Sequence, residues 1–349
     1  MQLGIYTFVE ATPDPLTGKK YSDSERMKNL IKEIELADQL GLDVFAIGEH
    51  HRHEFLVSAP AVVLAAAAVK TKNIRLSSAV TVLSSDDPVR VFQSFATVDL
   101  LSEGRAEIMA GRGSFTESFP LFGYDLDDYD TLFSEKLNLL LAINKNEKVN
   151  WEGGHRPALK NAGVYPRPHQ KEIPIWIAVG GTPQSAIRAG KLGLPMALAI
   201  IGGSPSRFVG FTDLYKETYK LSGHDLHKME LGINSHCFVA DTSEEAAEIF
   251  YPPYAALMTT IGKERGWSGM TKDQFDWMRS KEGSLVVGNS EEVAQKIIDE
   301  YKLFGNTRFL AQMSVGTMPH EKMMRSIELF AKDVAPRVKE YVKRNPVQL

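Results

Sequence analysis

The stretch DQLGLDVFAIGEHH, residues 38–51, contains one complete passage from helix to strand to polar loop. Gly41 is typical of a helix end, because glycine adopts the left-handed conformation there at little cost. A β-branched and aromatic run starts within two residues of it, and Glu49, His50 and His51 follow that run. A strand that starts directly after a helix and ends in a polar loop is the repeating unit of an α/β protein.

The same unit recurs along the whole chain. Strands are predicted at residues 2–8, 43–48, 74–83, 105–110, 174–179, 195–200, 230–239 and 307–313. Helices are predicted at residues 24–40, 60–70, 88–101, 130–144, 183–192, 208–222, 291–304 and 321–335. Strict alternation implies parallel strands joined by crossover helices, and about eight such units favour a closed (β/α)8 barrel, the TIM barrel, over an open sheet.

Two connections are longer than a barrel requires, so we predict insertions after strands 4 and 7. They are residues 146–172 and residues 241–290. No change in composition marks a second folded unit, so we predict a single domain, residues 1–349. We interpret the insertion at about 241–290 as a lid or a wall of the substrate pocket. A packing extension or a subunit contact is the alternative.

Composition restricts the class of protein. A formal net charge of -4, without any block of Lys or Arg, argues against a nucleic-acid partner. The single cysteine, Cys237, excludes an internal disulfide framework. Residues 1–8 lack the features of a signal peptide, and the apolar run 59–69 is shorter than the roughly 20 residues that span a bilayer. We therefore expect a cytoplasmic protein with no membrane contact.

Glu49, His50 and His51 follow the second strand, at the barrel end where active sites form. Alternation along a strand would place Glu49 and His51 on one face and His50 on the other, so the group cannot converge on a metal. We expect no metal site. Acid–base or hydrogen-bonding work on an organic ligand is preferred, since histidine titrates near neutral pH and a nearby carboxylate can orient it. A polar strand end without a catalytic role is the alternative.

The segment VGGTPQSAIRAG, residues 179–190, predicts an anion site. Thr182 is a good N-cap residue and Pro183 a good first helical residue, so a helix starts there with free N–H groups. The two preceding glycines allow close approach of a phosphate, and Ser185 adds a hydroxyl. Arg112 follows the fourth strand and could supply the charge that a phosphate dianion prefers. A simple helix cap is the alternative.

Three blocks in this order, residues 41–55, 76–115 and 174–199, resemble the bacterial-luciferase-like family of flavin-dependent monooxygenases. The resemblance implies a TIM barrel that uses reduced FMN, delivered by a separate flavin reductase, and O₂. Some relatives use the deazaflavin F420 instead. It also implies a homodimer. The helix predicted at residues 60–70 is apolar almost all round and is the expected contact, with burial under the N-terminal segment as the alternative.

Site roles carry over from the resemblance residue by residue. His50 takes the place of the histidine credited with proton transfer near the flavin, with Glu49 beside it. A non-proline cis peptide that lies against the flavin ring is expected at Ala79–Val80. The phosphate-binding positions are Arg112, Gly181, Thr182 and Ser185, and the neighbouring Gly113 and Gly180 are also expected to bind the cofactor.

The resemblance does not imply light emission, because the sequence departs from the light-emitting members at two places. The region DDYDTL, residues 127–132, has no arginine where light-emitting members carry a second phosphate contact, and Gly111 replaces their reactive cysteine. The expected function is oxygenation of a small, apolar organic substrate with reduced FMN and O₂. An F420-dependent oxidoreductase of the same fold and a non-catalytic flavin-binding barrel are the alternatives.

A water-excluding cover over the site is the last expectation. Aromatic residues that could form it follow the fourth strand and lie in the long insertion, and ordinary loop packing is the alternative. They are Phe115, Phe119, Phe122, Tyr124, Trp267 and Trp277.

Overall fold

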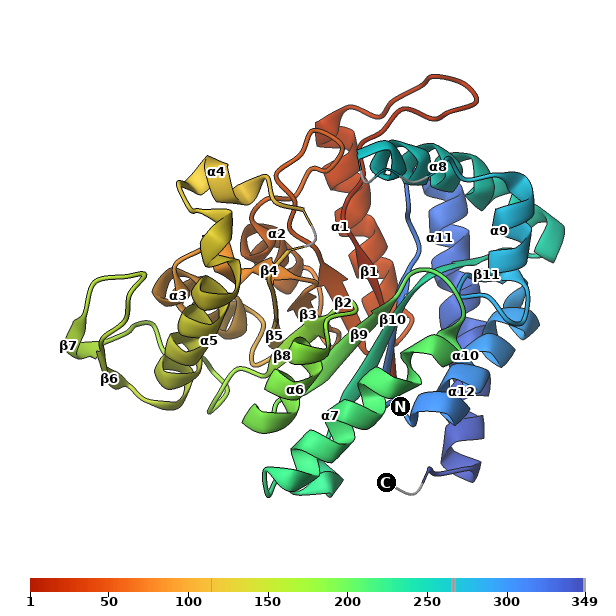
Figure 1. Cartoon of the computed structure of the whole chain (residues 1–349). Helices are drawn as coiled ribbons and strands as arrows, with labels where there is room; N and C mark the ends of the chain where they lie inside the picture. The colour runs from red at the N-terminus through yellow and green to blue at the C-terminus, as the bar shows by residue number, and fades with distance from the viewer. Residues whose placement is uncertain (114, 265, 267, 348–349) are drawn as a thin grey trace.

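The computed structural model describes residues 1–113, 115–264, 266 and 268–347. Its centre is a closed barrel of eight parallel strands (Figure 1). The strands are β1 (Gln2–Thr7), β2 (Val44–Ile47), β3 (Arg75–Ser78), β5 (Ala106–Gly111), β8 (Ile175–Val179), β9 (Met196–Ile200), β10 (Leu231–Val239) and β12 (Arg308–Gln312). They pair in this order, and β12 pairs with β1 to close the ring. The predicted fold is confirmed.

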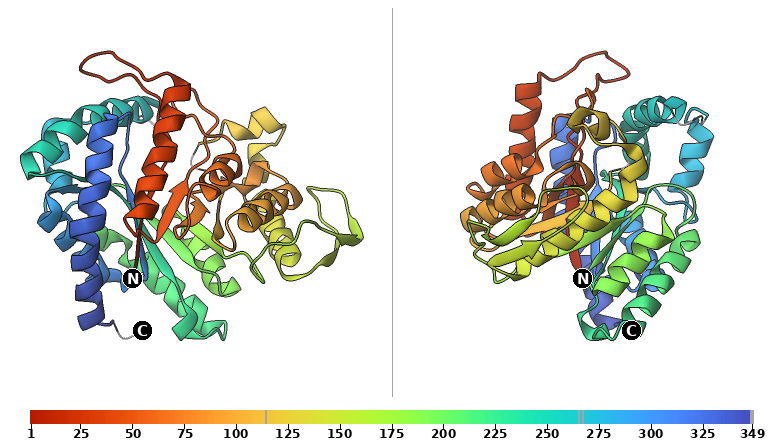
Figure 2. Two further views of the ribbon diagram at one scale, coloured as in Figure 1. Left: turned by 180° about the vertical axis from the view of Figure 1, so that it is seen from behind. Right: turned by 60° about the vertical axis from the view of Figure 1, so that its left-hand side comes forward.

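Helices cover the outside of the barrel, each close to its predicted place (Figures 1 and 2). They are α1 (Asp23–Gln39), α2 (Pro60–Ala68), α3 (Pro88–Leu101), α5 (Tyr129–Lys145), α6 (Pro183–Leu192), α7 (Val209–Leu221), α10 (Ser290–Phe304), α11 (His320–Leu329) and α12 (Ala335–Arg344). The helix predicted at residues 321–335 was predicted too short. A π-helical turn at Phe330–Val334 joins α11 to α12, so the helical segment continues to Arg344.

The third predicted strand is interrupted, which corrects the prediction of one continuous strand. A cis peptide bond joins Ala79 to Val80, as the family resemblance implied, and separates β3 from β4 (Thr81–Val82). The short strand β4 continues the pairing with β5, where Thr81 lies opposite Ala110. The main chain therefore bulges between β3 and β4.

Both long connections contain their own secondary structure. The helix α4 (Ser118–Phe122) follows β5, and a hairpin of β6 (Lys148–Trp151) and β7 (Leu159–Gly163) projects from the barrel after α5 (Figure 1). The insertion after β10 contains α8 (Ser243–Glu264), α9 (Lys272–Arg279) and β11 (Val286–Gly288). The strand β11 pairs in parallel with β10. In both views α8 lies at the upper end of the barrel, where the strands finish (Figure 2).

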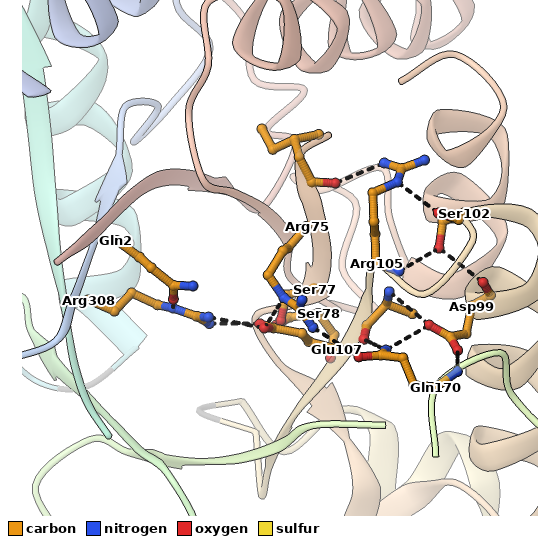
Figure 3. Close-up of polar contacts among 12 residues, drawn as sticks. Gln2, Arg75, Ser77, Ser78, Asp99, Ser102, Arg105, Glu107, Gln170 and Arg308 are labelled. Carbon is orange, nitrogen blue, oxygen red and sulfur yellow. Dashed lines mark hydrogen bonds and ion pairs between the residues drawn. The ribbon is translucent and has the colours of Figure 1, made fainter. Parts of the chain in front are cut away.

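A buried ion network lies where β3, β5 and β12 begin (Figure 3). The carboxylate of Glu107 accepts hydrogen bonds from Arg308 Nη1 at 2.7 Å and Nη2 at 3.0 Å, and from Arg75 Nε at 2.5 Å. The Arg308 guanidinium also lies 4.0 Å from the ring centre of Trp176. These side chains fill the lower end of the barrel and leave the upper end for ligands. Among the described residues no helix is both long and apolar enough to cross a membrane.

Candidate active site

A cavity of about 350 Å³ lies at the upper end of the barrel. Small-ligand sites typically measure about 300–1,000 Å³, so the cavity has the size of such a site. Its wall contains every residue predicted for the site except Gly181, which lies between two of them in the chain. These wall residues are Glu49, His50, Ala79, Val80, Arg112, Gly113, Gly180, Thr182 and Ser185.

One end of the cavity is formed by the start of α6. Gly181 has a φ of 122°, a backbone conformation that favours glycine, and it turns the chain from β8 into the helix. Thr182 occupies the N-cap position and Pro183 follows it, as predicted, but the Thr182 side chain makes no capping hydrogen bond. The N–H of Ser185 donates to the Thr182 carbonyl at 3.0 Å. Both hydroxyls are therefore placed beside a helix start that attracts anions.

Arg112 reaches the same end of the cavity from the loop after β5. Its Nη2 donates to Ser185 Oγ at 3.3 Å, and its guanidinium lies 4.9 Å from the ring centre of Tyr129. The Tyr129 hydroxyl donates to the Gly113 carbonyl at 2.9 Å. Sequence reasoning missed Tyr129, which directly precedes the helix predicted at residues 130–144 and is the first residue of α5 in the structure. The cavity wall thus contains one guanidinium and the hydroxyl-bearing side chains of Tyr129, Thr182 and Ser185.

The bulge at Ala79–Val80 forms a second part of the wall, and Gly111 makes room for it. A Cβ atom at Gly111 would lie 2.8 Å from Val80 Cγ2 and 2.9 Å from Val80 Cγ1. Such distances are too short for any side chain, so glycine allows the bulged peptide to approach β5. Ala178 and Ala199 add further small side chains to the wall. This part of the wall is therefore built from main chain and small side chains.

His50 is enclosed by aromatic rings. Its imidazole centre lies 4.6 Å from Phe8, 4.5 Å from Phe55 and 5.0 Å from Phe115. Its Nε2 is buried and has no hydrogen-bond partner among the described residues. Burial, with a smaller contribution from the positive charge of the nearby Arg52, lowers the pKa of His50 to about 3. The imidazole is therefore neutral at physiological pH, whereas the sequence suggested a histidine that titrates near neutrality.

The Glu49 carboxylate holds His51 and the end of the bulge, which corrects the expected pairing with His50. Its Oε1 lies 2.9 Å from His51 Nε2, and its Oε2 accepts the Val82 N–H at 2.9 Å. The hydrogen bond to Glu49 raises the pKa of His51. Among the described residues no three His, Cys, Asp or Glu side chains come close enough together to hold a metal ion.

The aromatic residues predicted as a cover take different positions. Phe115 contacts His50, whereas Phe119 is fully buried against Tyr129, with ring centres 5.4 Å apart. Phe122 contacts the ring of His51, and Tyr124 lies beneath the ammonium of Lys136. Trp267 lies outside the described residues. Trp277 is half exposed on α9 and is not part of the cavity wall.

The long insertion contacts the His50 loop directly. Arg52 donates from Nη1 to Glu264 Oε2 at 2.7 Å and from Nη2 to Oε1 at 2.5 Å, so the end of α8 is tied to the loop after β2. The same guanidinium lies 4.7 Å from the ring centre of Phe115. None of the described residues of 241–290 lines the cavity itself.

Asn234, on β10, is a wall residue that sequence reasoning missed. Its Oδ1 is buried without a hydrogen-bond partner among the described residues. Strand alternation was the available signal, because it separates Asn234 and His236 from Ser235 and Cys237. An unpartnered buried amide oxygen beside a cavity marks a place where a ligand can donate a hydrogen bond.

Comparisons with known proteins agree with this geometry. A family model described as luciferase-like monooxygenase matches residues 1–308. The alkanal monooxygenase alpha chain of Photorhabdus laumondii is 26% identical over 345 residues, covering 92% of this chain and 95% of that protein. The oxygenase component of the flavin-dependent trigonelline monooxygenase of Acinetobacter baylyi is 24% identical over 375 residues, covering 97% of this chain and 96% of that protein.

Solved structures show the same fold. The oxygenating constituent of 3,6-diketocamphane monooxygenase of Pseudomonas putida, in complex with FMN, has a TM-score of 0.78 at 21% identity and covers 97% of this chain and 98% of its own. An F420-dependent secondary alcohol dehydrogenase has a TM-score of 0.72 at 20% identity, with coverage of 97% and 98%. With the family model matching most of the sequence, the chain belongs to the luciferase-like monooxygenases and is an oxidoreductase of that family.

Proposed function

We propose that the cavity holds reduced FMN and that the protein uses it with O₂ to oxygenate a small, apolar organic substrate. The observation that carries this proposal is the combination, in one cavity, of an anion-binding end and a broad hollow. The first end suits a phosphate monoester and the second suits a flat ring system. FMN carries both groups in one molecule.

The phosphate would be held by Arg112, Thr182 and Ser185. The Arg112 side chain and the Ser185 hydroxyl already contact each other, and the Thr182 hydroxyl is not used as a helix cap. Gly113, Gly180 and Gly181 let the main chain come close to the phosphate oxygens, as short glycine loops before helices do. The donor set therefore fits the group.

The flavin ring would lie against the Ala79–Val80 bulge. Gly111 beside the bulge, and Ala178 and Ala199 elsewhere in the wall, leave room for a tricyclic ring because they carry no bulky side chains. Two unpartnered polar groups, His50 Nε2 and Asn234 Oδ1, belong to wall residues and can be satisfied by a ligand. When bound, reduced FMN would supply the electrons for the reaction and a ring carbon that reacts with O₂.

The neutral imidazole of His50 would exchange a proton with the ligand, or hydrogen-bond to it, through Nε2. The surrounding Phe8, Phe55 and Phe115 exclude water, so a hydrogen bond from this imidazole acts in a medium of low polarity, where it is stronger than in water. Glu49 would be a positioning residue, because it fixes His51 and the Val82 N–H rather than His50.

We also propose that a separate flavin reductase supplies the reduced FMN, since the similar trigonelline enzyme is named as an oxygenase component. Use of F420 is the alternative that the similar fold of the alcohol dehydrogenase favours. Measuring the affinities of the protein for FMN and for F420 would distinguish these two functions. A flavin-binding barrel without catalysis would bind FMN but oxygenate nothing.

We also propose that the protein forms a homodimer through α2 and α3. Val62 on α2 and Val69, which directly follows it, are 70% and 65% exposed, and Leu100 and Leu101 at the end of α3 are also exposed. Helices α2 and α3 contact each other, so these side chains favour a homodimer contact in a cytoplasmic enzyme. A Val62→Asp variant should be monomeric in size-exclusion chromatography with light scattering, while Leu221→Asp on α7 should not change the mass. An unchanged mass for Val62→Asp would contradict this contact.

We propose that the chain is one domain in which the 241–290 insertion acts as a lid, held to the His50 loop by Arg52 and Glu264. Breaking this ion pair with Arg52→Gln should increase exchange of reduced FMN without changing the folding transition. An unchanged exchange rate would argue for a packing extension instead.

The central experiment compares two histidines of the same loop. His50 is buried in the cavity wall, whereas the side chain of His53 is 92% exposed. We expect His50→Ala to slow the formation of oxygenated product from an apolar test substrate and added reduced FMN by about 10²-fold or more, as for loss of a proton-transfer group, with FMN affinity within about threefold. His53→Ala should behave as the unchanged protein. Equal product formation by both variants would contradict the role of His50, and absence of FMN binding would contradict the whole proposal.

A further inference from the structure

A carboxylate that the proposed function does not use lies just outside the anion end of the cavity, bound to the wall residue Arg112. Asp130 lies in the first turn of α5, and its Oδ1 accepts a hydrogen bond from Arg112 Nη1 at 2.5 Å. The side chain of Asp130 is 72% exposed, so nothing in the core requires a charge there. The arginine that would receive a phosphate is therefore already paired with an anion of the protein itself.

We propose that Asp130 competes with the ligand phosphate for Arg112 and so keeps the affinity for FMN low enough for rapid exchange. This inference rests on the proposed function and deepens it. It identifies the residue that sets how tightly the phosphate is held and how fast the cofactor leaves. Rapid exchange suits a protein that receives its reduced cofactor from another protein in each cycle.

The geometry leaves Arg112 little freedom to avoid this competition. Its guanidinium is fixed by Ser185 on Nη2, by Asp130 on Nη1 and by the ring of Tyr129 on one face. A phosphate beside Ser185 must either displace the carboxylate from Nη1 or lie close to it. Either arrangement costs binding free energy, because like charges a few ångströms apart repel each other.

A second arginine balances the charge at this place. Arg188 lies three residues after Ser185 on α6, and its Nη2 donates to Ser134 Oγ at 3.1 Å. Its Nη1 is buried and has no partner among the described residues. Burial lowers the pKa of Arg188, and the neighbouring Arg112 lowers it further while Asp130 opposes the shift. The two guanidiniums and one carboxylate thus form one charged group with a net charge of about +1.

The test measures dissociation constants for FMN and for riboflavin, which has no phosphate, by fluorescence quenching. For Asp130→Asn we expect FMN to bind about tenfold more tightly and to dissociate more slowly, while riboflavin affinity changes less than about twofold. For Arg188→Gln we expect weaker FMN binding and unchanged riboflavin binding. Asp127→Asn is the matched control, because it removes the same charge from an exposed residue that contacts no arginine in the described structure.

Each outcome decides between the two proposals. Unchanged or weaker FMN binding by Asp130→Asn, with the unmodified protein binding FMN, would overturn this inference alone. An equal gain in Asp127→Asn would also overturn it, since the effect would then be one of overall charge. Failure of FMN to bind any of the variants would overturn the proposed function first. Asp130→Ser serves as a second variant, and both should unfold at the temperature of the unmodified protein.

Discussion

The ion network at the lower end of the barrel allows a quantitative test of the fold. Glu107 and Arg308 have side-chain exposures of only 3% and 2%, and Arg75 approaches the same carboxylate. In Glu107→Gln the amide oxygen can accept from one arginine, but the amide nitrogen then faces another donor. Arg308 then loses the buried carboxylate that it binds, although the negative charge of Glu230 still acts on Arg308 and Arg75. Removing one partner of a buried pair costs about 3–5 kcal/mol, so we expect a loss of that size in unfolding free energy.

The assay is urea denaturation, followed by the fluorescence of tryptophan, since Trp176 contacts Arg308. Asp276→Asn is the control, because Asp276 and Lys272 form a half-exposed pair whose loss should cost less than about 1 kcal/mol. The acid dependence gives a second measurement. Burial alone would raise the pKa of Glu107, but Arg308 and Arg75 outweigh it and hold the pKa below its usual value. The stabilisation is therefore present above the unfolded pKa and is lost as pH falls through the folded pKa, and Glu107→Gln should abolish this loss.

If Glu107→Gln were destabilised no more than the control, the barrel base would not depend on this carboxylate. The same conclusion would follow if the variant kept the acid dependence of the unmodified protein. Either result would refute the argument that a desolvated arginine needs its partner there.

Three further predictions concern single residues in the upper half of the barrel and on β10. Gly111→Ala should lose about 1–3 kcal/mol of stability through the contact with Val80, whereas Gly210→Ala, with open space around it, should lose nothing; equal melting temperatures would contradict this. Burial lowers the pKa of His236 to about 4, so the unfolded chain binds more protons between that value and 6.5, and stability falls as pH falls through this range. His236→Gln should remove about 2 kcal/mol of the loss between pH 7 and pH 5 in pH-dependent denaturation, and an unchanged slope would argue against burial of a neutral ring. Burial also raises the pKa of the Cys237 thiol, so an aromatic disulfide reagent should label it only after unfolding; rapid labelling of native protein would contradict the buried position.

Local sequence signals determined the parts of the fold that could be predicted. The strand between Gly41 and Glu49 is set by a glycine helix end, a β-branched run and a polar exit, all of which act within a few residues. The start of α6 is similarly local, because Pro183 fixes its own backbone angle wherever it occurs. The barrel followed because about eight alternating units favour a closed ring over an open sheet.

The chemistry of the site depends on contacts between distant segments, which a single sequence does not contain. The adjacent position of Glu49 and His50 suggested a pair, but the fold turns the carboxylate toward His51 and Val82 instead. The pKa of His50 depends on its burial against Phe8 and Phe115, which lie in the loops after β1 and β5. The contact between Arg112 and Asp130 likewise forms only when α5 packs beside the loop after β5.

The ion pair between Arg52 and Glu264 has a consequence for how such a barrel can acquire new substrates. The insertion after β10 differs most from a minimal barrel, and it would be the natural segment to exchange when specificity is redesigned. Any graft that replaces Glu264 leaves Arg52 with Glu54 as its carboxylate partner and so loosens a guanidinium that stacks on Phe115, the ring beside His50. Successful chimaeras should therefore carry positions 52, 115 and 264 together as one inherited set, even though they are distant in the gene.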